Sequence, residues 1–265
     1  MKTSFIFACA TLLLFTSCNI KSDNGFPLNF GTKEGNGIIK TQQFMMNFDE
    51  IKISQSIAAE LVKSSTEKVV VTAPSDIIDD ILVENDNGRL YIHFKSGLNI
   101  SARNVAVKIF AKDFSKLEAN SSASIAIKDQ FTQEKTEIKV GSSGSISGNL
   151  EANDLSIDVS SSGSYSGKIW AVNLVADVSS SGDIIISGKT KNANLDASSS
   201  GTLDAKGVMA ENAEIEASSS GSASLSVSNE LRASANSSGD VIIKKIGNLN
   251  IFSQKENSGG SISIQ

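Results

Sequence analysis

A cluster of serines followed by a small residue recurs along the second half of the chain. The small residue is alanine at the first occurrence and glycine at all the others, and successive copies are 18 to 21 residues apart. The copies fall at Ala123, Gly144, Gly163, Gly182, Gly201, Gly221, Gly239 and Gly259. A period near 19 residues over eight copies is typical of a solenoid, in which each repeat is one coil stacked on the next.

The residues around each glycine keep the same register from copy to copy. Before Gly163, for example, Ile157 and Val159 are apolar and Asp158 between them is polar, and Tyr165 follows the glycine by two residues. This alternation predicts a half-buried strand on each side of a tight Ser-Ser-Gly corner. A flexible Ser/Gly-rich linker is excluded, because a linker would not carry apolar residues in phase over seven repeats.

The same register identifies the structural corners of the predicted coils. They are Gly144, Gly163, Gly182, Gly201, Gly221 and Gly239. Because glycine tolerates a positive φ, we expect these glycines to supply the backbone freedom that a tight corner needs. We also expect the serine hydroxyls of stacked corners to form ladders of hydrogen bonds near the core.

Residues 39–116 lack the serial corners but still contain strand-like segments. We expect them to form the first, decorated coils of one solenoid domain over residues 39–265, ahead of the regular coils of residues 117–265. Between Pro74 and Glu84 the apolar residues recur with helical spacing, which predicts one short helix that covers an open end. The predicted fold class is therefore all-β, a parallel β-solenoid with coils of about 19 residues and one capping helix.

The N-terminus resembles a bacterial lipoprotein signal. Lys2 precedes an apolar stretch over residues 5–15, and the small residues Thr16 and Ser17 precede Cys18. The resemblance implies that residues 1–17 are a signal peptide that is cleaved off. It also implies that Cys18 is then acylated, and that the acyl chains anchor the protein in the outer membrane of the bacterial envelope. The polar residues 18–38 show no periodicity, which predicts a flexible tether.

The body of the chain resembles the family described as putative auto-transporter adhesin, head GIN domain, which is common among exported proteins of Bacteroidetes. The resemblance covers residues 44–265. It rests on residues 51–53, 69–71, 87–92 and 105–109, followed by the serial corners that begin after Leu117. It implies a right-handed coil and a location in the cell envelope.

Charge and residue content exclude several classes of function. A net charge of −5 argues against nucleic-acid binding, which usually needs a basic surface. The single histidine, His93, lies in a predicted strand and is expected to be exposed, and a Ser-His-Asp triad would have to use it. The sequence has no nucleophile elbow, no phosphate-binding loop and no Cys/His cluster. We therefore expect neither an enzyme nor a cofactor.

One register position offers a candidate cation site. Acids occupy the position five before the glycine in four successive coils, at Asp158, Asp177, Asp196 and Glu216. Stacking would place the backbones of neighbouring acids about 4.8 Å from one another, and a bound calcium ion would relieve the repulsion between their carboxylates. A solvated acidic face and glycan catalysis by the acids are the alternatives. Lys139, which interrupts the column one coil earlier, favours the solvated face.

These observations predict a non-catalytic envelope lipoprotein that acts as an adhesin or surface-binding scaffold. One alternative is a structural envelope component without an external ligand, and another is a polysaccharide-acting enzyme built on a β-helix. The expected partners are the membrane, through the lipid anchor, and a glycan or protein on another surface. Association with a second copy through the exposed ends of the solenoid is also expected.

Overall fold

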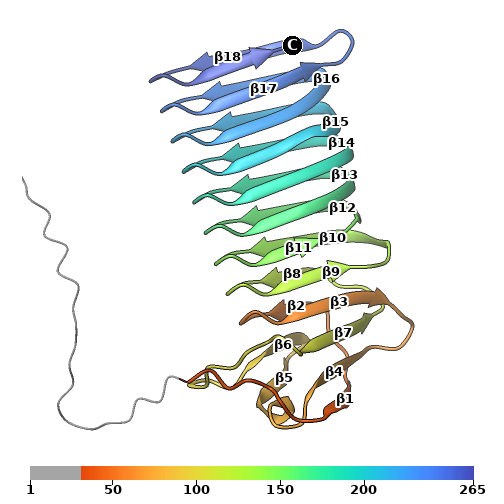
Figure 1. The fold of residues 1–265 in the computed structure, drawn as a ribbon. Helices are drawn as coiled ribbons and strands as arrows, with labels where there is room; N and C mark the ends of the chain where they lie inside the picture. The colour runs from red at the N-terminus through yellow and green to blue at the C-terminus, as the bar shows by residue number, and fades with distance from the viewer. Residues whose placement is uncertain (1–30) are drawn as a thin grey trace, which may run out of the picture. The chain divides into compact units, whose positions relative to one another are not determined.

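The computed structural model describes residues 31–265, so the predicted signal peptide and Cys18 lie outside the described residues. Residues Thr32–Gln265 form one compact unit of nineteen strands and one short 3-10 turn (Figure 1). Within this part of the chain, no helix is long and apolar enough to cross a membrane.

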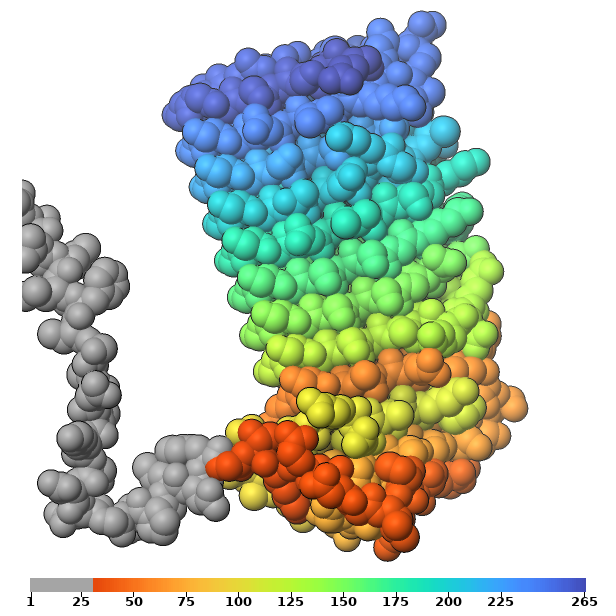
Figure 2. Space-filling view, in the orientation of Figure 1, coloured from red at the N-terminus to blue at the C-terminus, as the bar shows by residue number. Residues whose placement is uncertain are grey.

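The regular coils stack in parallel and in register, with an offset of about 19 residues. Val159 pairs with Val178, and Val178 pairs with Ala197. Figure 2 shows the successive coils as parallel ridges on the surface. The strands of these coils are β8 (Lys116–Ala119), β9 (Ser124–Ile127), β10 (Phe131–Val140), β11 (Ser145–Ser147), β12 (Leu150–Val159), β13 (Ser164–Val178), β14 (Asp183–Ala197), β15 (Thr202–Ala217), β16 (Ser222–Ala235), β17 (Asp240–Lys245), β18 (Asn250–Glu256) and β19 (Ser261–Ile264). The predicted parallel solenoid is confirmed, and its right-handed sense stays a prediction.

The core is one continuous column of inward side chains. The residues predicted to point inward before each corner, such as Ile138, Ile157 and Leu195, are buried, and so are Ile146 and Tyr165 after the corner. Burying one such isoleucine or leucine contributes about 1.5–3 kcal/mol. A single coil cannot bury these side chains alone, so the stabilisation comes from stacking on the neighbouring coils.

The first coils do not stack in the order of the sequence. The coil formed by β2 (Glu50–Ile53) and β3 (Ala58–Lys63) lies between the regular coils and the coil formed by β6 (Arg89–Phe94) and β7 (Ala106–Ala111) (Figure 1). β2 pairs in parallel with both β6 and β8, and β3 pairs in parallel with both β7 and β9. An early segment of the chain therefore separates two later ones.

The predicted capping helix is wrong, because antiparallel strands cover this end of the solenoid. β5 (Ile81–Asp86) pairs with β6, β4 (Lys68–Pro74) pairs with β7, and β1 (Ile39–Met45) pairs with β4. The only helical element here is a 3-10 turn, η1 (Ile78–Asp80). Asn87 and Gly88, with φ of 52° and 89°, form a tight hairpin turn that returns the chain along β6. The hairpin satisfies the edge of β6, which a helix would leave unpaired.

The corners also differ from the prediction in their backbone. The positive φ falls on the two residues before each glycine, as at Ser180 (52°) and Ser181 (61°), and none of the six predicted corner glycines has one. The glycine is needed for space, because a Cβ on Gly144 would lie 2.5 Å from the carbonyl oxygen of Ala119 in the preceding coil. In the last corner Gly259, with φ of 77°, takes the place of a serine, and Gly260 takes the place of the glycine.

The ladders at the corners are made by the backbone rather than by the serine hydroxyls. The N–H of Ser162 donates to the carbonyl oxygen of Ser180 at 3.1 Å, and the N–H of Ser181 donates to that of Ser199 at 3.2 Å. The two serines of each regular corner are exposed, and their hydroxyls form no hydrogen bond with other residues of the described part. Each corner thus leaves two hydroxyls facing solvent.

Residues 33–37, at the end of the predicted tether, are held against the body. The N–H of Lys33 donates to the carbonyl oxygen of Asn99 at 2.7 Å, and its ammonium pairs with Asp80 at 2.5 Å. The carboxylate of Asp76 accepts the N–H groups of Asn36 and Gly37, and these bonds hold the pKa of Asp76 below its ordinary value. The chain is therefore fixed to the solenoid before β1 begins.

Candidate functional site

One outward column of side chains runs along the stack and passes through ten coils. We call it the charged column. It is contributed by the strand that precedes each corner, from an outward position that lies between two buried side chains in every coil but the last. In spatial order it consists of Tyr91, Lys52, Glu118, Lys139, Asp158, Asp177, Asp196, Glu216, Ser234 and Lys255. The structure thus brings the four predicted acids into adjacent coils, as their register requires.

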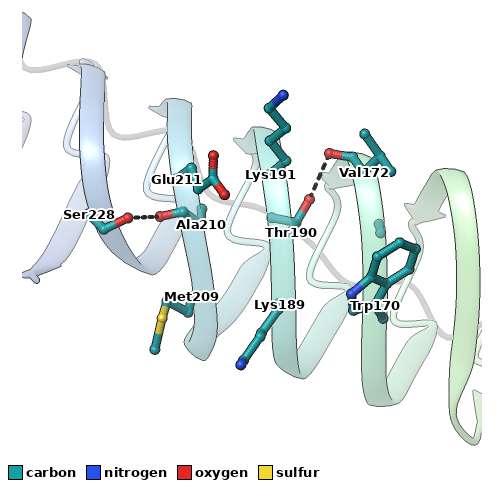
Figure 3. A pocket seen from close by; sticks show the side chains of 10 residues that line it. Trp170, Val172, Lys189, Thr190, Lys191, Met209, Ala210, Glu211 and Ser228 are labelled. Atoms are coloured by element: carbon teal, nitrogen blue, oxygen red, sulfur yellow. Dashed lines mark hydrogen bonds between the residues drawn. The ribbon is translucent and has the colours of Figure 1, made fainter.

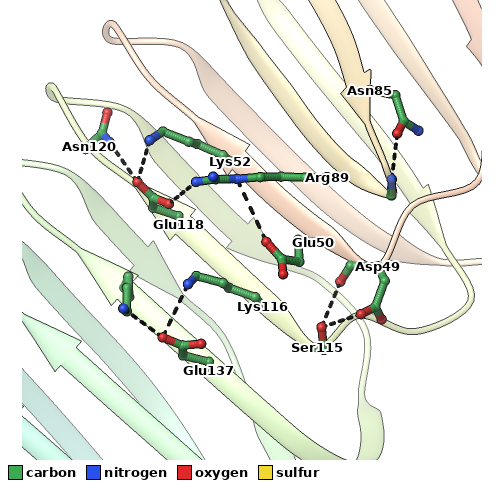
Figure 4. Close-up of polar contacts among 12 residues, drawn as sticks. Asp49, Glu50, Lys52, Asn85, Arg89, Ser115, Lys116, Glu118, Asn120 and Glu137 are labelled. Atoms are coloured by element: carbon green, nitrogen blue, oxygen red, sulfur yellow. Dashed lines mark hydrogen bonds and ion pairs between the residues drawn. The ribbon is translucent and has the colours of Figure 1, made fainter.

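The part of the charged column nearest the cap is neutralised by ion pairs (Figure 4). The carboxylate of Glu118 forms ion pairs with Lys52 at 2.7 Å and with Arg89 at 2.8 Å, so it links three adjacent coils. Glu137, on the same side of the coils, forms ion pairs with Lys139 at 2.9 Å and with Lys116 at 3.3 Å. Because the charge of the side chains alternates in sign from coil to coil here, neighbouring side chains in the stack attract one another.

These contacts lower the pKa of both carboxylates. Burial alone would raise the pKa of Glu118, but its bonds with Lys52 and the charge of Arg89 outweigh burial and leave the pKa below its ordinary value. The hydrogen bond from Lys139 is the main reason that the pKa of Glu137 is lowered, and the same bond raises the pKa of Lys139. Both acids are therefore held in the charged form.

The four acids beyond Lys139 are not neutralised by ion pairs. None of Asp158, Asp177, Asp196 and Glu216 forms an ion pair with another residue in the range 31–265. Loss of hydration raises the pKa of Asp177, and the charges of Asp196 and Asp158 raise it further. Loss of hydration also raises the pKa of Asp196. This stretch, which we call the acidic stretch, is a row of unneutralised carboxylates at the spacing of the coils.

The acidic stretch does not have the geometry of a chelating site. In the part of the chain that the structure describes, no group of three or more His, Cys, Asp or Glu side chains is placed to hold a metal ion. The carboxylates are stacked in a row, whereas calcium needs six to eight oxygens around one point. Calcium binding therefore stays a prediction. Chemically, the row can attract cationic groups on a partner.

His93 is not the exposed residue that its strand position predicted. Only 12% of its side chain is exposed, and its ring stacks on that of Tyr91 with centroids 4.1 Å apart. Nδ1 lies 2.8 Å from the carbonyl oxygen of Phe94, so it donates there, and Nε2 lies 3.2 Å from Glu84. The ring is thus held by β5 and β6, and neither nitrogen bonds a serine or cysteine of the described residues.

A second ladder, of asparagines, was not among the predicted sites. The side-chain N–H of Asn192 donates to the side-chain oxygen of Asn173 at 2.9 Å. The side-chain oxygen of Asn192 accepts the side-chain N–H of Asn212 at 2.9 Å. Asn229 continues the ladder beyond Asn212, and Asp154 ends it by accepting from Asn173. The signal was present in the sequence, because Asn173, Asn192 and Asn212 recur with the period of the coils.

Known proteins support the fold and the family. Residues 47–173 and 165–246 match the family described as putative auto-transporter adhesin, head GIN domain. A putative lipid-binding protein from Parabacteroides distasonis shares the fold, with 24% identity and a TM-score of 0.78, over 89% of this chain and 100% of that chain. A putative adhesin from the same species has 20% identity and a TM-score of 0.81, over 89% and 100% of the two chains.

A putative adhesin from Parabacteroides merdae is similar as well, with 20% identity and a TM-score of 0.74, over 88% of this chain and 99% of that chain. No curated protein matches the sequence. At these identities the solved structures establish the fold alone, whereas the family match extends over most of the solenoid. The chain belongs to the putative auto-transporter adhesin, head GIN domain family.

Proposed function

We propose that this protein is a non-catalytic adhesin that presents its solenoid as a rigid binding surface on a bacterial envelope. The observation that carries the proposal is the outward face of the stack, where side chains of one register position repeat from coil to coil. Such columns offer many weak contacts at a constant spacing, which suits an extended ligand. The family, whose description names an adhesin head, agrees with this function.

The test is binding by the isolated body. Residues 32–265 form a compact unit, and two similar solved chains match 89% of this chain over 100% of their own lengths, so the body is expected to fold alone. Labelled body would be incubated with whole cells and with glycan and protein arrays. Saturable binding to an external surface supports an adhesin, and its absence favours a structural envelope component. Turnover of a polysaccharide that is lost on mutating Asp158 or Asp177 would contradict the non-catalytic function.

The proposal includes a lipid anchor at Cys18. In this scheme residues 1–17 are removed, the thiol of Cys18 is acylated, and the following residues connect the outer membrane to the solenoid. Multiple acyl chains anchor stably, because each buried CH₂ contributes about 0.8 kcal/mol.

Replacing Cys18 by serine is therefore expected to release the protein from the membrane fraction or to leave the signal uncleaved. Cys9, which lies within the apolar stretch, provides the matched control, and Cys9→Ser is expected to change neither cleavage nor fractionation. Unchanged partitioning of the Cys18 variant into Triton X-114 would contradict the anchor.

A further inference from the structure

The only tryptophan of the chain lies on the outer surface of the regular coils. Trp170, on β13, is 47% exposed. It stands in an outward column between Glu151 on β12 and Lys189 on β14, and Met209, which is 45% exposed, follows on β15. Tryptophan and methionine are enriched where proteins bind their partners, so two exposed side chains of these types in one column point to a binding site.

Trp170 separates two hollows that follow each other along the stack. The larger, of about 320 Å³, extends from β13 across β14 and β15 to Ser228 on β16 (Figure 3). Its base includes Thr190 and Ala210, which are buried, and its two sides carry Met209 and Lys191. The smaller, of about 180 Å³, extends from Trp170 back across β12 to Gln130. The indole is therefore the shared wall of two neighbouring hollows.

The polar groups around the indole are of both signs. Lys168, Lys189 and Lys191 line the hollows, and none of them forms an ion pair with another residue in the range 31–265. Glu151 and Glu211 also line them, the former in the smaller hollow and the latter in the larger. Three unpaired ammonium groups can bind carboxylates, and two carboxylates can accept bonds from hydroxyls.

This combination fits an acidic sugar chain better than other ligands. The face of an indole carries negative charge, which attracts the C–H groups on the apolar face of a pyranose ring. An extended peptide would need an open strand edge for its backbone, whereas Trp170 lies on a strand that is paired on both sides. Two hollows in succession along the stack, with an aromatic ring between them, suit a ligand built of repeating units.

We propose that an oligosaccharide containing uronic acid residues lies along the stack across Trp170. One sugar ring stacks on the indole, and the adjoining rings occupy the two hollows. The sugar carboxylates pair with Lys168, Lys189 and Lys191. This inference rests on the proposed adhesin function and names the ligand class and the site through which it acts.

The test uses the full chain, purified in a detergent without a sugar head group. Because Trp170 is the only tryptophan, its fluorescence reports on this site alone. Titration with a galacturonate tetrasaccharide is expected to change the emission saturably, and raising the salt concentration is expected to weaken binding. The neutral tetrasaccharide of glucose is expected to bind at least about tenfold more weakly, because it offers no carboxylate to the lysines.

Variants locate the site, with calorimetry as the readout where the tryptophan is lost. Trp170→Ala is expected to weaken uronate binding by at least about tenfold, since stacked aromatic rings dominate such contacts. Lys189→Gln is expected to weaken it severalfold. Lys40→Gln, which changes an exposed lysine of β1 near the capped end, is the matched control and is expected to leave binding unchanged. Urea midpoints would show that each variant is folded.

The possible outcomes separate this inference from the adhesin function. Uronate binding that survives Trp170→Ala would overturn the site. Equal affinity for the neutral tetrasaccharide would overturn the role of the lysines. Absence of oligosaccharide binding while the body still binds whole cells would overturn the ligand class and leave the adhesin function standing. Absence of both would contradict the inference and the adhesin function together.

Discussion

At the scale of single residues, the corner divides its work between two kinds of residue. The two serines adopt left-handed backbone, which costs an L-residue about 1–2 kcal/mol, and the N–H of the second bonds the next coil. The glycine adopts an ordinary φ and leaves room for the preceding coil. A recurring glycine in a sequence says only that a side chain is not tolerated. It does not distinguish a demand for positive φ from a demand for space, so the expectation that the glycine adopts the positive φ is wrong.

The demand for space gives a test within a single corner. Gly144→Ala would bring a Cβ to 2.5 Å from the backbone oxygen of Ala119, so the coils must move apart. We expect a loss of about 2 kcal/mol or more in the free energy of unfolding, measured by urea denaturation. Gly141→Ala, at the other end of the same corner, meets only the hydroxyl of Ser160 at 3.6 Å. It should stay within about 0.5 kcal/mol of the parent, and equal losses for the two variants would contradict the role of space.

At the scale of strands, parallel stacking in register converts any repeated side chain into a ladder. Whether the ladder stabilises the stack depends on chemistry. Amides donate on one side and accept on the other, so the asparagine ladder bonds every coil to the next. Carboxylates can only accept, so the acidic stretch accumulates like charges. The same geometry thus gives cohesion in one column and repulsion in another.

The asparagine ladder predicts that two alanine variants on β14 differ in stability. Asn192→Ala removes the bond to the side-chain oxygen of Asn173 and the bond from the amide N–H of Asn212, while Asn173 keeps Asp154 and Asn212 keeps Asn229 as partners. We expect it to lower the free energy of unfolding by about 1–2 kcal/mol. Asn194→Ala, two residues along and exposed, is the control and should change stability by less than about 0.5 kcal/mol. Indistinguishable urea midpoints would mean that the ladder contributes nothing.

The acidic stretch predicts a gain of stability from removing a charge. The pKa of Asp177 is raised in the folded state, so its charge opposes folding at pH 7, and the penalty disappears as the pH falls through the folded pKa towards the ordinary value of 3.8. Asp177→Asn should therefore raise the free energy of unfolding at pH 7 by less than about 1 kcal/mol, because the group is exposed, and leave it unchanged near pH 3.

Two further variants control the sign of this effect. Asp183→Asn changes an exposed carboxylate outside the charged column and should have little effect at either pH. Glu118→Gln should act oppositely. The pKa of Glu118 is lowered, so its contribution to stability is present above 4.5 and is lost as the pH falls through the folded pKa. Destabilisation by Asp177→Asn at pH 7 would contradict the assigned repulsion.

At the scale of the whole solenoid, the two ends differ. One end is covered by β1, β4 and β5, whereas the outer edges of β18 and β19 have no partner strand in the described part. The last coil replaces inward apolar residues by Gln254 and Glu256, in register with Ala233 and Ala235. The carboxylate of Glu256 accepts the N–H of Ile262 at 2.9 Å. Inward polar groups discourage further stacking, so they oppose the predicted association through this end, which stays a prediction.

The unequal ends predict a gradient of local stability. Backbone amides of β18 and β19 are expected to exchange hydrogen for deuterium much faster than those of β13 and β14, which are bonded to coils on both sides. Amides of β6 and β7, next to the cap, should be protected like the central coils. Mass spectrometry of exchanged peptides from the full chain would measure the profile, and equal exchange in β13 and β19 would contradict it.

The sequence predicted the repetitive part of the molecule and missed what does not repeat. Period, register and inward residues follow from one pattern, so β10 to β17 could be placed from it. The segment around Ile78 carries a pattern too short to separate helix from strand, and only the pairing of β5 with β6 decides it. Trp170 was missed for a related reason, because an outward side chain breaks no rule of the repeat and is recognised only by its exposure.

The insertion of β2 and β3 between later coils determines the order in which the solenoid can form. Glu50 pairs with Arg89 on one side and with Lys116 on the other, so both neighbours of β2 are synthesised after it. From β10 onwards each new coil finds its template already in place and can add in sequence. The coil of β2 and β3, in contrast, must close a long loop for the pairing on each of its two sides, which makes its docking slow. Until residues 89–127 have been made, both edges of β2 and β3 are therefore unpaired, and the growing chain exposes apolar side chains of its future core.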